Sequence, residues 1–117
     1  MNSPHETTER SSKINLPLAI KLIRNYHGYS QRDLSNASGL PQSVISEVES
    51  SSKTITLRTL EAYSRTLNIP ISIIVRFAED LTDAMEATEQ SELSISFLQR
   101  AFISFASLLR ATQRGDL

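Results

Sequence analysis

The placement of proline and glycine constrains the fold of this chain more than any other sequence feature. The chain has only three glycines and four prolines, too few for a sandwich or barrel, which needs a turn about every 8–12 residues. Pro17, Pro41 and Pro70 each open an apolar pattern with helical spacing, and Gly28 and Gly39 each close one. Proline is favoured in the first turn of a helix and glycine just after the last. We therefore predict an all-α chain of short, consecutive helices.

The apolar spacing also predicts where the helices lie. We expect helices over 17–27, from the cap Ser30 to the turn at Gly39, over 41–50, from the cap Thr56 to Leu67, from about Pro70 to as far as Thr88, and over 92–112. In the first five of these, the residues expected to face the core are Leu18, Leu22, Ile23, Tyr26, Leu34, Ala37, Val44, Ile45, Val48, Leu57, Leu60, either Tyr63 or Leu67, Ile74 and Phe77.

Composition divides the chain into three regions. Residues 1–15 are polar and lack an apolar period, so we expect a disordered N-terminal arm. Residues 16–79 contain the compact helical unit, with seven basic and five acidic side chains. Residues 80–117 carry three basic and six acidic side chains and are expected to form an amphipathic helical extension.

Several classes of function are not supported by the sequence. The chain has no cysteine and only two histidines, His5 and His27, so no metal site is expected, and no cofactor motif is present. A phosphate-binding glycine loop and a nucleophile elbow are also missing, which argues against an enzyme. There is no apolar run of signal-peptide or membrane-spanning length, so we expect a cytoplasmic protein without membrane contact.

The stretch from Ser30 to Glu49 carries the functional signal. It predicts a short helix, a tight turn at Gly39 and a second helix, whose apolar positions 44, 45 and 48 leave a polar edge. That edge consists of Gln42, Ser43, Ser46 and Glu47. A helix-turn-helix places its second helix in the major groove, where such side chains meet base-edge donors and acceptors.

The segments SQRDLSNASGLPQSVISEVE and TLRTLEAYSRTLNIPISIIV resemble the Cro/phage-repressor type of helix-turn-helix, the XRE family. The resemblance covers residues 16–79 and implies a five-helix, lambda-repressor-like bundle. It implies sequence-specific binding of double-stranded DNA, by a regulator that is usually a dimer on a near-palindromic operator. We therefore expect a homodimeric transcriptional repressor.

The resemblance also implies roles for individual residues. Base contacts are expected from Gln42, Ser43, Ser46 and Glu47, and a phosphate contact from Gln31. An ion pair between Arg24 and Glu49 would lock the first helix to the recognition helix. Arg32, Lys53 and Arg58 flank that helix as candidate phosphate contacts. Two residues depart from the family pattern: Glu47 is acidic where a basic or amide residue is common, and Ser51 stands where glycine is common.

The apolar stripe of the last expected helix needs a partner surface. Its residues Leu93, Phe97, Phe102, Phe105 and Leu109 are predicted to form a dimer contact, as part of a hairpin over 70–112. Packing on its own bundle is the alternative for this helix. For the whole chain, the alternatives are an antitoxin that binds its toxin through residues 80–117, and a protein-interaction adaptor without DNA binding.

Overall fold

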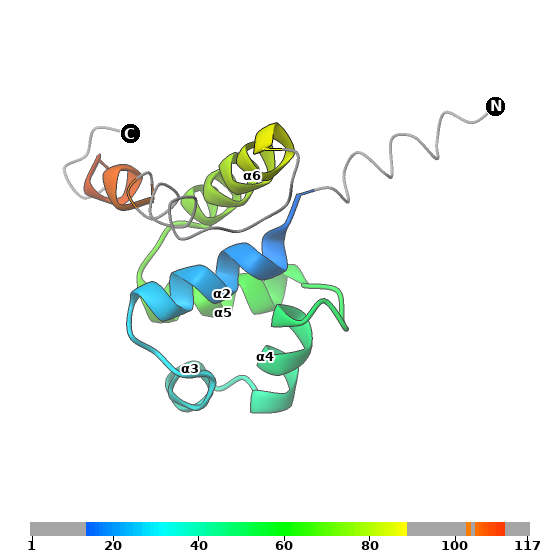
Figure 1. Cartoon of the computed structure of the whole chain (residues 1–117). Coiled ribbons are helices and arrows are strands. Elements are labelled where there is room, and N and C mark those ends of the chain that lie inside the picture. The colour runs from blue at the N-terminus through cyan, green and yellow to red at the C-terminus, as the bar shows by residue number, and fades with distance from the viewer. Residues whose placement is uncertain (1–13, 89–102, 104, 112–117) are drawn as a thin grey trace.

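Five helices, α2 to α6, form the body of the protein (Figure 1). The structure is a computed structural model that describes residues 14–88, 103 and 105–111. The helices are α2 (Leu16–Tyr26), α3 (Gln31–Ser38), α4 (Gln42–Glu49), α5 (Leu57–Leu67) and α6 (Ile71–Thr88). Residues 105–111 are also helical, and the described residues contain no strand. The prediction of an all-α, lambda-repressor-like bundle is confirmed.

The helix starts follow from local capping chemistry. The side chain of Asn15 accepts the backbone N–H of Leu18 at the start of α2, and that of Thr56 accepts the N–H of Thr59 at the start of α5. Ser30 and Asp33 form a reciprocal capping box at the start of α3. The caps predicted at Ser30 and Thr56 are thus confirmed.

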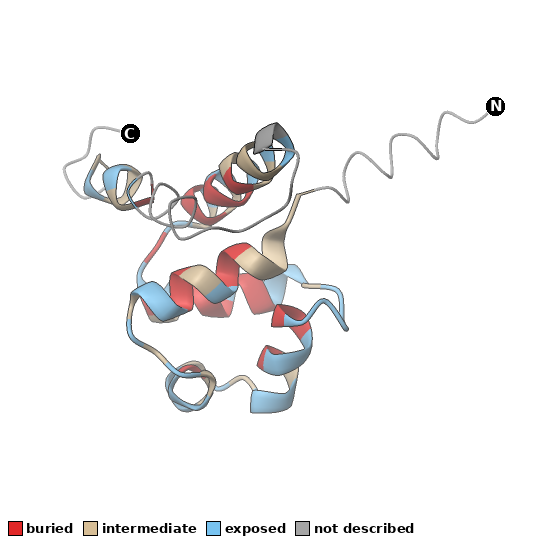
Figure 2. Ribbon diagram, in the orientation of Figure 1, coloured by how far each residue is buried: buried red, intermediate tan, exposed pale blue. Residues whose placement is uncertain are grey.

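The core lies between α2, α5 and α6, with α3 and α4 packed below α2 and α5 (Figure 2). Its fully buried side chains include Ile20, Ile23, Leu34, Ile45, Tyr63, Ile74 and Phe77. The described helical residues 105–111 lie on the same side of the bundle as α6, away from α3 and α4 (Figure 1). None of the helices in the described ranges is long and apolar enough to cross a bilayer.

Three residues predicted to face the core are exposed. Tyr26 is 46% exposed and Leu57 is 64% exposed, and Ala37 also lies on the surface. In α2 the buried residues are Ala19, Ile20, Ile23 and Arg24. Of these, Ile23 was predicted to face the core, and the buried face is centred there because α6 and α4 both pack on this helix. Leu57, Tyr26 and Ala37 lie in the first or last turns of their helices. In the part of the chain that the structure describes, too little packs against Leu57 to bury its side chain.

Candidate nucleic-acid interface

The turn between α3 and α4 is held by local hydrogen bonds. Gly39 closes α3 in the left-handed conformation, with φ of 84°, and its N–H donates to the carbonyl of Ser35. The Ser35 hydroxyl donates to the carbonyl of Leu40 at 2.6 Å, and the N–H of Leu40 donates to the hydroxyl of Ser38 at 3.1 Å. Because a residue with a Cβ is strained at this φ, glycine at position 39 allows the sharp entry into α4.

Helix α4 has one buried face and one exposed polar edge. Ile45 and Val48 are 0% and 1% exposed and join the core. All four residues of the predicted base-reading edge are exposed: Gln42, Ser43, Ser46 and Glu47. In Figure 1, α3 and α4 lie at the end of the bundle opposite α6, so the described part of the C-terminal region does not cover this edge.

A buried carboxylate anchors α4 to its neighbours. Glu49, at the end of α4, accepts hydrogen bonds from Nε of Arg24 at 2.8 Å and from its Nη2 at 2.7 Å. The hydroxyl of Tyr63 in α5 donates to Glu49 at 2.8 Å, and Nε2 of Gln31 in α3 donates at 3.3 Å. Arg24 also donates to the carbonyl of Tyr29 at 2.6 Å. One carboxylate therefore connects α4 to α2, α3 and α5.

The protonation states of this network favour its hydrogen bonds. Burial alone would raise the pKa of the Glu49 carboxyl, but hydrogen bonds from Arg24 and Tyr63 outweigh burial and hold that pKa below its ordinary value. The hydrogen bond to Glu49 raises the pKa of the Arg24 guanidinium. Burial, aided by the bond to Glu49, raises the pKa of the Tyr63 hydroxyl. At neutral pH Glu49 is an ionised acceptor between a charged and a neutral donor.

Comparison with protein families matches residues 20–74 to the Cro/C1-type helix-turn-helix. Residues 20–74 form a helix-turn-helix domain of the XRE family. This family consists of DNA-binding transcription regulators and is not a family of enzymes. The chain therefore carries a helix-turn-helix domain of the kind found in DNA-binding regulators of the XRE type. A comparison with curated proteins finds no match.

The residues expected to contact phosphates lie on the elements that precede and follow α4 in the chain. Arg32 in α3, Arg58 in α5 and Lys53 in the α4–α5 loop are exposed. Gln31 is half-buried, and its bond to Glu49 fixes its amide at the start of α3. Lys53 instead pairs with Glu47, with Nζ to Oε1 at 3.5 Å.

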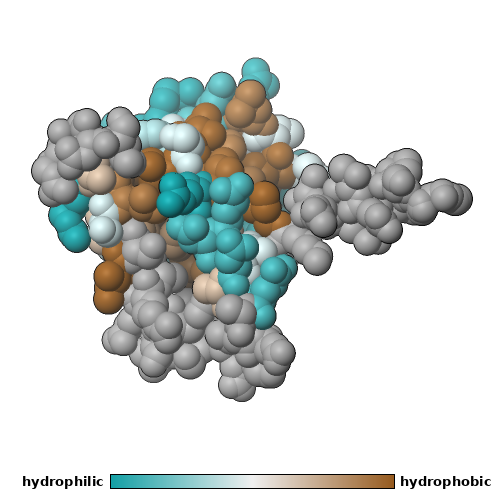
Figure 3. Space-filling model, turned by 90° about the horizontal axis from the view of Figure 1, so that it is seen from above, coloured by the Kyte–Doolittle hydropathy of each residue, from teal (hydrophilic) through white to brown (hydrophobic). Residues whose placement is uncertain are grey.

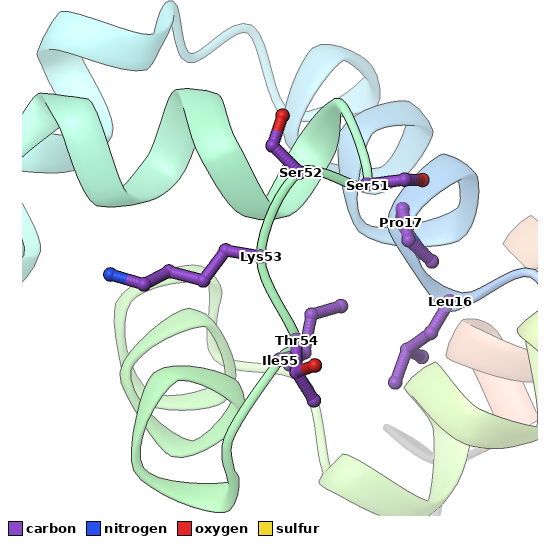
Figure 4. Close-up of a pocket in the computed structure, with 7 residues that line it drawn as sticks. All are labelled: Leu16, Pro17, Ser51, Ser52, Lys53, Thr54 and Ile55. Atoms are coloured by element: carbon purple, nitrogen blue, oxygen red, sulfur yellow. The ribbon is translucent and has the colours of Figure 1, made fainter.

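An open pocket separates the α4–α5 loop from the N-terminal end of α2 (Figure 4). It is lined by Leu16, Pro17, Ser51, Ser52, Lys53, Thr54 and Ile55. Figure 4 shows the Lys53 side chain extended away from Leu16 and Pro17. The ammonium of Lys53 thus belongs to the outer surface of the XRE domain rather than to this pocket.

The residues expected at a dimer contact divide into two groups. Leu93, Phe97 and Phe102 lie outside the described residues. Phe105 is fully buried within its own chain, with ring centroids 5.1 Å from Phe77 and 5.3 Å from Tyr26. Leu109 is half-buried against the same core. Phe105 fills an apolar site between α2 and α6, so in this structure it packs in its own chain instead of facing a second subunit.

Reasoning from the sequence did not identify all members of the Glu49 network. Tyr63 was expected only as a possible core residue, and the Tyr29 carbonyl was not considered. The signal that points to Tyr63 is chemical: a tyrosine on the apolar face of a helix needs a partner for its hydroxyl. Glu49 is the buried acceptor that Tyr63 can reach.

Proposed function

We propose that this XRE-type regulator is a homodimeric repressor that reads a near-palindromic operator in the major groove. The observation that carries the proposal is the exposed polar edge of α4, on a helix whose opposite side is fixed by Ile45, Val48 and Glu49. A recognition helix must present several side chains in a constant orientation, because each base contact depends on bond direction. The buried anchor at Glu49 supplies that constancy.

The side chains on this edge suit particular base contacts. The amide of Gln42, at the start of α4, can bond bidentately to N7 and the N6 amine of adenine. The carboxylate of Glu47 can accept from the N4 amine of cytosine. Ser43 and Ser46 are short donors and acceptors that let the helix approach the base edges. We assign these four residues to base readout.

Phosphate contacts would position α4 in the groove. Arg32 and Arg58 are exposed on the helices before and after α4 in the chain, and Lys53 lies in the loop that follows α4. Gln31 adds a neutral donor at the start of α3. With three cations, the affinity should fall with salt at a moderate slope of about 0.9 per neutralised phosphate.

A second copy of the chain would bind on the side opposite α4. Viewed from the side of α6, hydrophobic and hydrophilic residues alternate on the surface (Figure 3). Half-buried apolar residues of α6 and of the C-terminal segment include Val75, Ala84, Met85, Leu108 and Leu109. Dimerisation on this side leaves both copies of α4 free for DNA. We assign this contact to the region 80–117, in particular to Leu93, Phe97, Phe102 and Leu109.

In-vitro selection of bound duplexes by the purified full chain tests the proposal directly. We expect an enriched sequence with two inverted half-sites, their centres one helical turn or a multiple of about 34 Å apart. A promoter that contains the selected site should lose transcription when the protein is added. A selected sequence without dyad symmetry would contradict the homodimer. The absence of any enriched sequence would contradict specific DNA binding.

A further inference from the structure

Glu47 and Lys53 form a pair at the edge of the recognition helix. The Nζ of Lys53 lies 3.5 Å from Oε1 of Glu47, and the two side chains are 54% and 48% exposed. The backbone brings them together: the carbonyl of Glu47 accepts the N–H of Ser52 at 2.8 Å and the N–H of Lys53 at 3.2 Å. The loop thus folds back onto the last turn of α4, and the cation is held beside the carboxylate.

This pairing changes what each residue can offer to DNA. A lysine ammonium that neutralises Glu47 contributes little to a nearby phosphate, because the two anions compete for it. If Glu47 lost Lys53 in a groove lined by phosphates, its carboxylate would be an anion without a partner among other anions. Glu47 and Lys53 can both gain contacts to DNA only where a base-edge amine replaces the Lys53 ammonium as the partner of Glu47. Lys53 is then free to contact a phosphate.

We propose that Glu47 and Lys53 act as one coupled specificity element, an inference that rests on the proposed function. On the cognate site, Glu47 accepts from a cytosine N4 amine and Lys53 passes to a phosphate. On other sequences Glu47 retains Lys53, and neither residue adds affinity. Glu47 then sets specificity mainly by withholding a phosphate contact from non-cognate DNA.

The four proteins of a double-mutant cycle test this coupling: wild type, Glu47→Gln, Lys53→Met and the double variant. Their affinities for a duplex of scrambled sequence are measured by fluorescence anisotropy over a range of salt concentrations. Glu47→Gln should tighten binding about two- to five-fold, the strength of an exposed ion pair. Its salt slope should steepen by about 0.9, because Lys53 is released to one phosphate.

The gain from Glu47→Gln should largely disappear when Lys53 is already methionine. Simple repulsion between Glu47 and phosphates predicts the reverse, an equal or larger gain without Lys53, because nothing then neutralises the carboxylate. An equal or larger gain in the Lys53→Met background would overturn the proposal. An unchanged salt slope for Glu47→Gln would overturn it as well.

The chain offers a matched control on the far side of the bundle. Arg76 and Asp80 form an exposed pair on α6, with Nε to Oδ2 at 3.6 Å, and α6 lies across the bundle from α4 (Figure 1). Asp80→Asn makes the same charge change and should leave affinity and salt slope as in the wild type. An equal gain in affinity for Asp80→Asn would show that the effect of Glu47→Gln comes from net charge alone, and it would overturn the proposed coupling. If the wild type binds no duplex, the proposed function itself fails, whereas binding without coupling refutes only this inference.

Discussion

At the scale of single residues, Glu49 shows how a polar group can organise a small core. Its carboxylate lies in the interior with side-chain exposure of 2%, against 6% for that of Arg24. Removing a charge from water is costly, and the bidentate partner together with the Tyr63 hydroxyl offsets that cost. No buried side-chain polar atom among the described residues lacks a hydrogen-bond partner. The network therefore specifies how α2, α4 and α5 meet.

Replacing Glu49 with glutamine should destabilise the fold by about 3–5 kcal/mol, because Arg24 then keeps a buried charge without its counter-ion. Urea unfolding followed by circular dichroism measures the loss. The double variant Arg24→Met with Glu49→Leu is the control, since it removes both charges and keeps apolar volume. It should recover much of the stability, and a double variant no more stable than Glu49→Gln would show that the charge is not the cause.

The lowered pKa of Glu49 predicts how stability depends on pH. The pKa of the Glu49 carboxyl in the folded chain lies below its ordinary value in the unfolded chain, so the unfolded chain binds more protons across the interval between the two values. The stabilisation is complete above that unfolded value and is lost as the pH falls through the folded pKa. Melting temperatures from neutral to acid pH should therefore converge for wild type and Glu49→Gln. A constant gap across that range would contradict the assignment.

Gln42 is the residue whose loss should reveal base readout most clearly. Gln42→Ala should weaken binding to the selected operator by about 1–3 kcal/mol and relax the preference at one base pair in each half-site. Affinity for a scrambled duplex provides the control, because the loss of a base contact should leave it unchanged. Unchanged selectivity would remove Gln42 from the readout set.

At the scale of helices, the sequence predicted what local chemistry decides. The caps at Ser30 and Thr56, the turn at Gly39 and the continuation of α6 to Thr88 all depend on nearby residues. The buried faces were predicted less well, since Tyr26 and Leu57 are exposed. Which side of a helix is covered depends on distant neighbours, and spacing alone cannot supply them. The polar edge of α4 was predictable because the apolar positions 44, 45 and 48 lie on one face of a single short helix and leave the opposite face polar.

The α4–α5 connection contains a residue in an unfavourable conformation. Ser51 has φ of 68°, in the left-handed region, where a residue with a Cβ costs about 1–2 kcal/mol. Ser51→Gly removes that strain from the folded state. Glycine also raises the conformational entropy of the unfolded chain, which offsets part of the gain. We therefore expect a net stabilisation of about 0.5–1 kcal/mol. Thermal unfolding measures it. Ser52→Gly is the neighbouring control, at a position without positive φ, and should destabilise; stabilisation by both would point to general loop flexibility.

At the scale of the whole molecule, the two ends of the bundle serve different purposes. The end formed by α3 and α4 is polar and exposed, whereas the α6 side receives the C-terminal helical residues (Figure 1). Phe105 joins these parts through its contacts with Phe77 and Tyr26. The segment that carries Phe105 is therefore both a cover for the core and, in our proposal, part of the surface where a second copy binds.

Truncation of Phe105 separates these two roles. Phe105→Ala should cost about 3–5 kcal/mol of unfolding free energy, since the ring is fully buried against α2 and α6. Ile103→Ala is the matched control, two residues earlier and 67% exposed, and should change stability by less than about 0.5 kcal/mol in a monomer. Urea unfolding of both variants at several protein concentrations decides the matter. A Phe105→Ala loss that is the same at every concentration indicates packing within one chain. A loss that grows with concentration would mean that the ring packs across the dimer, as the sequence first suggested.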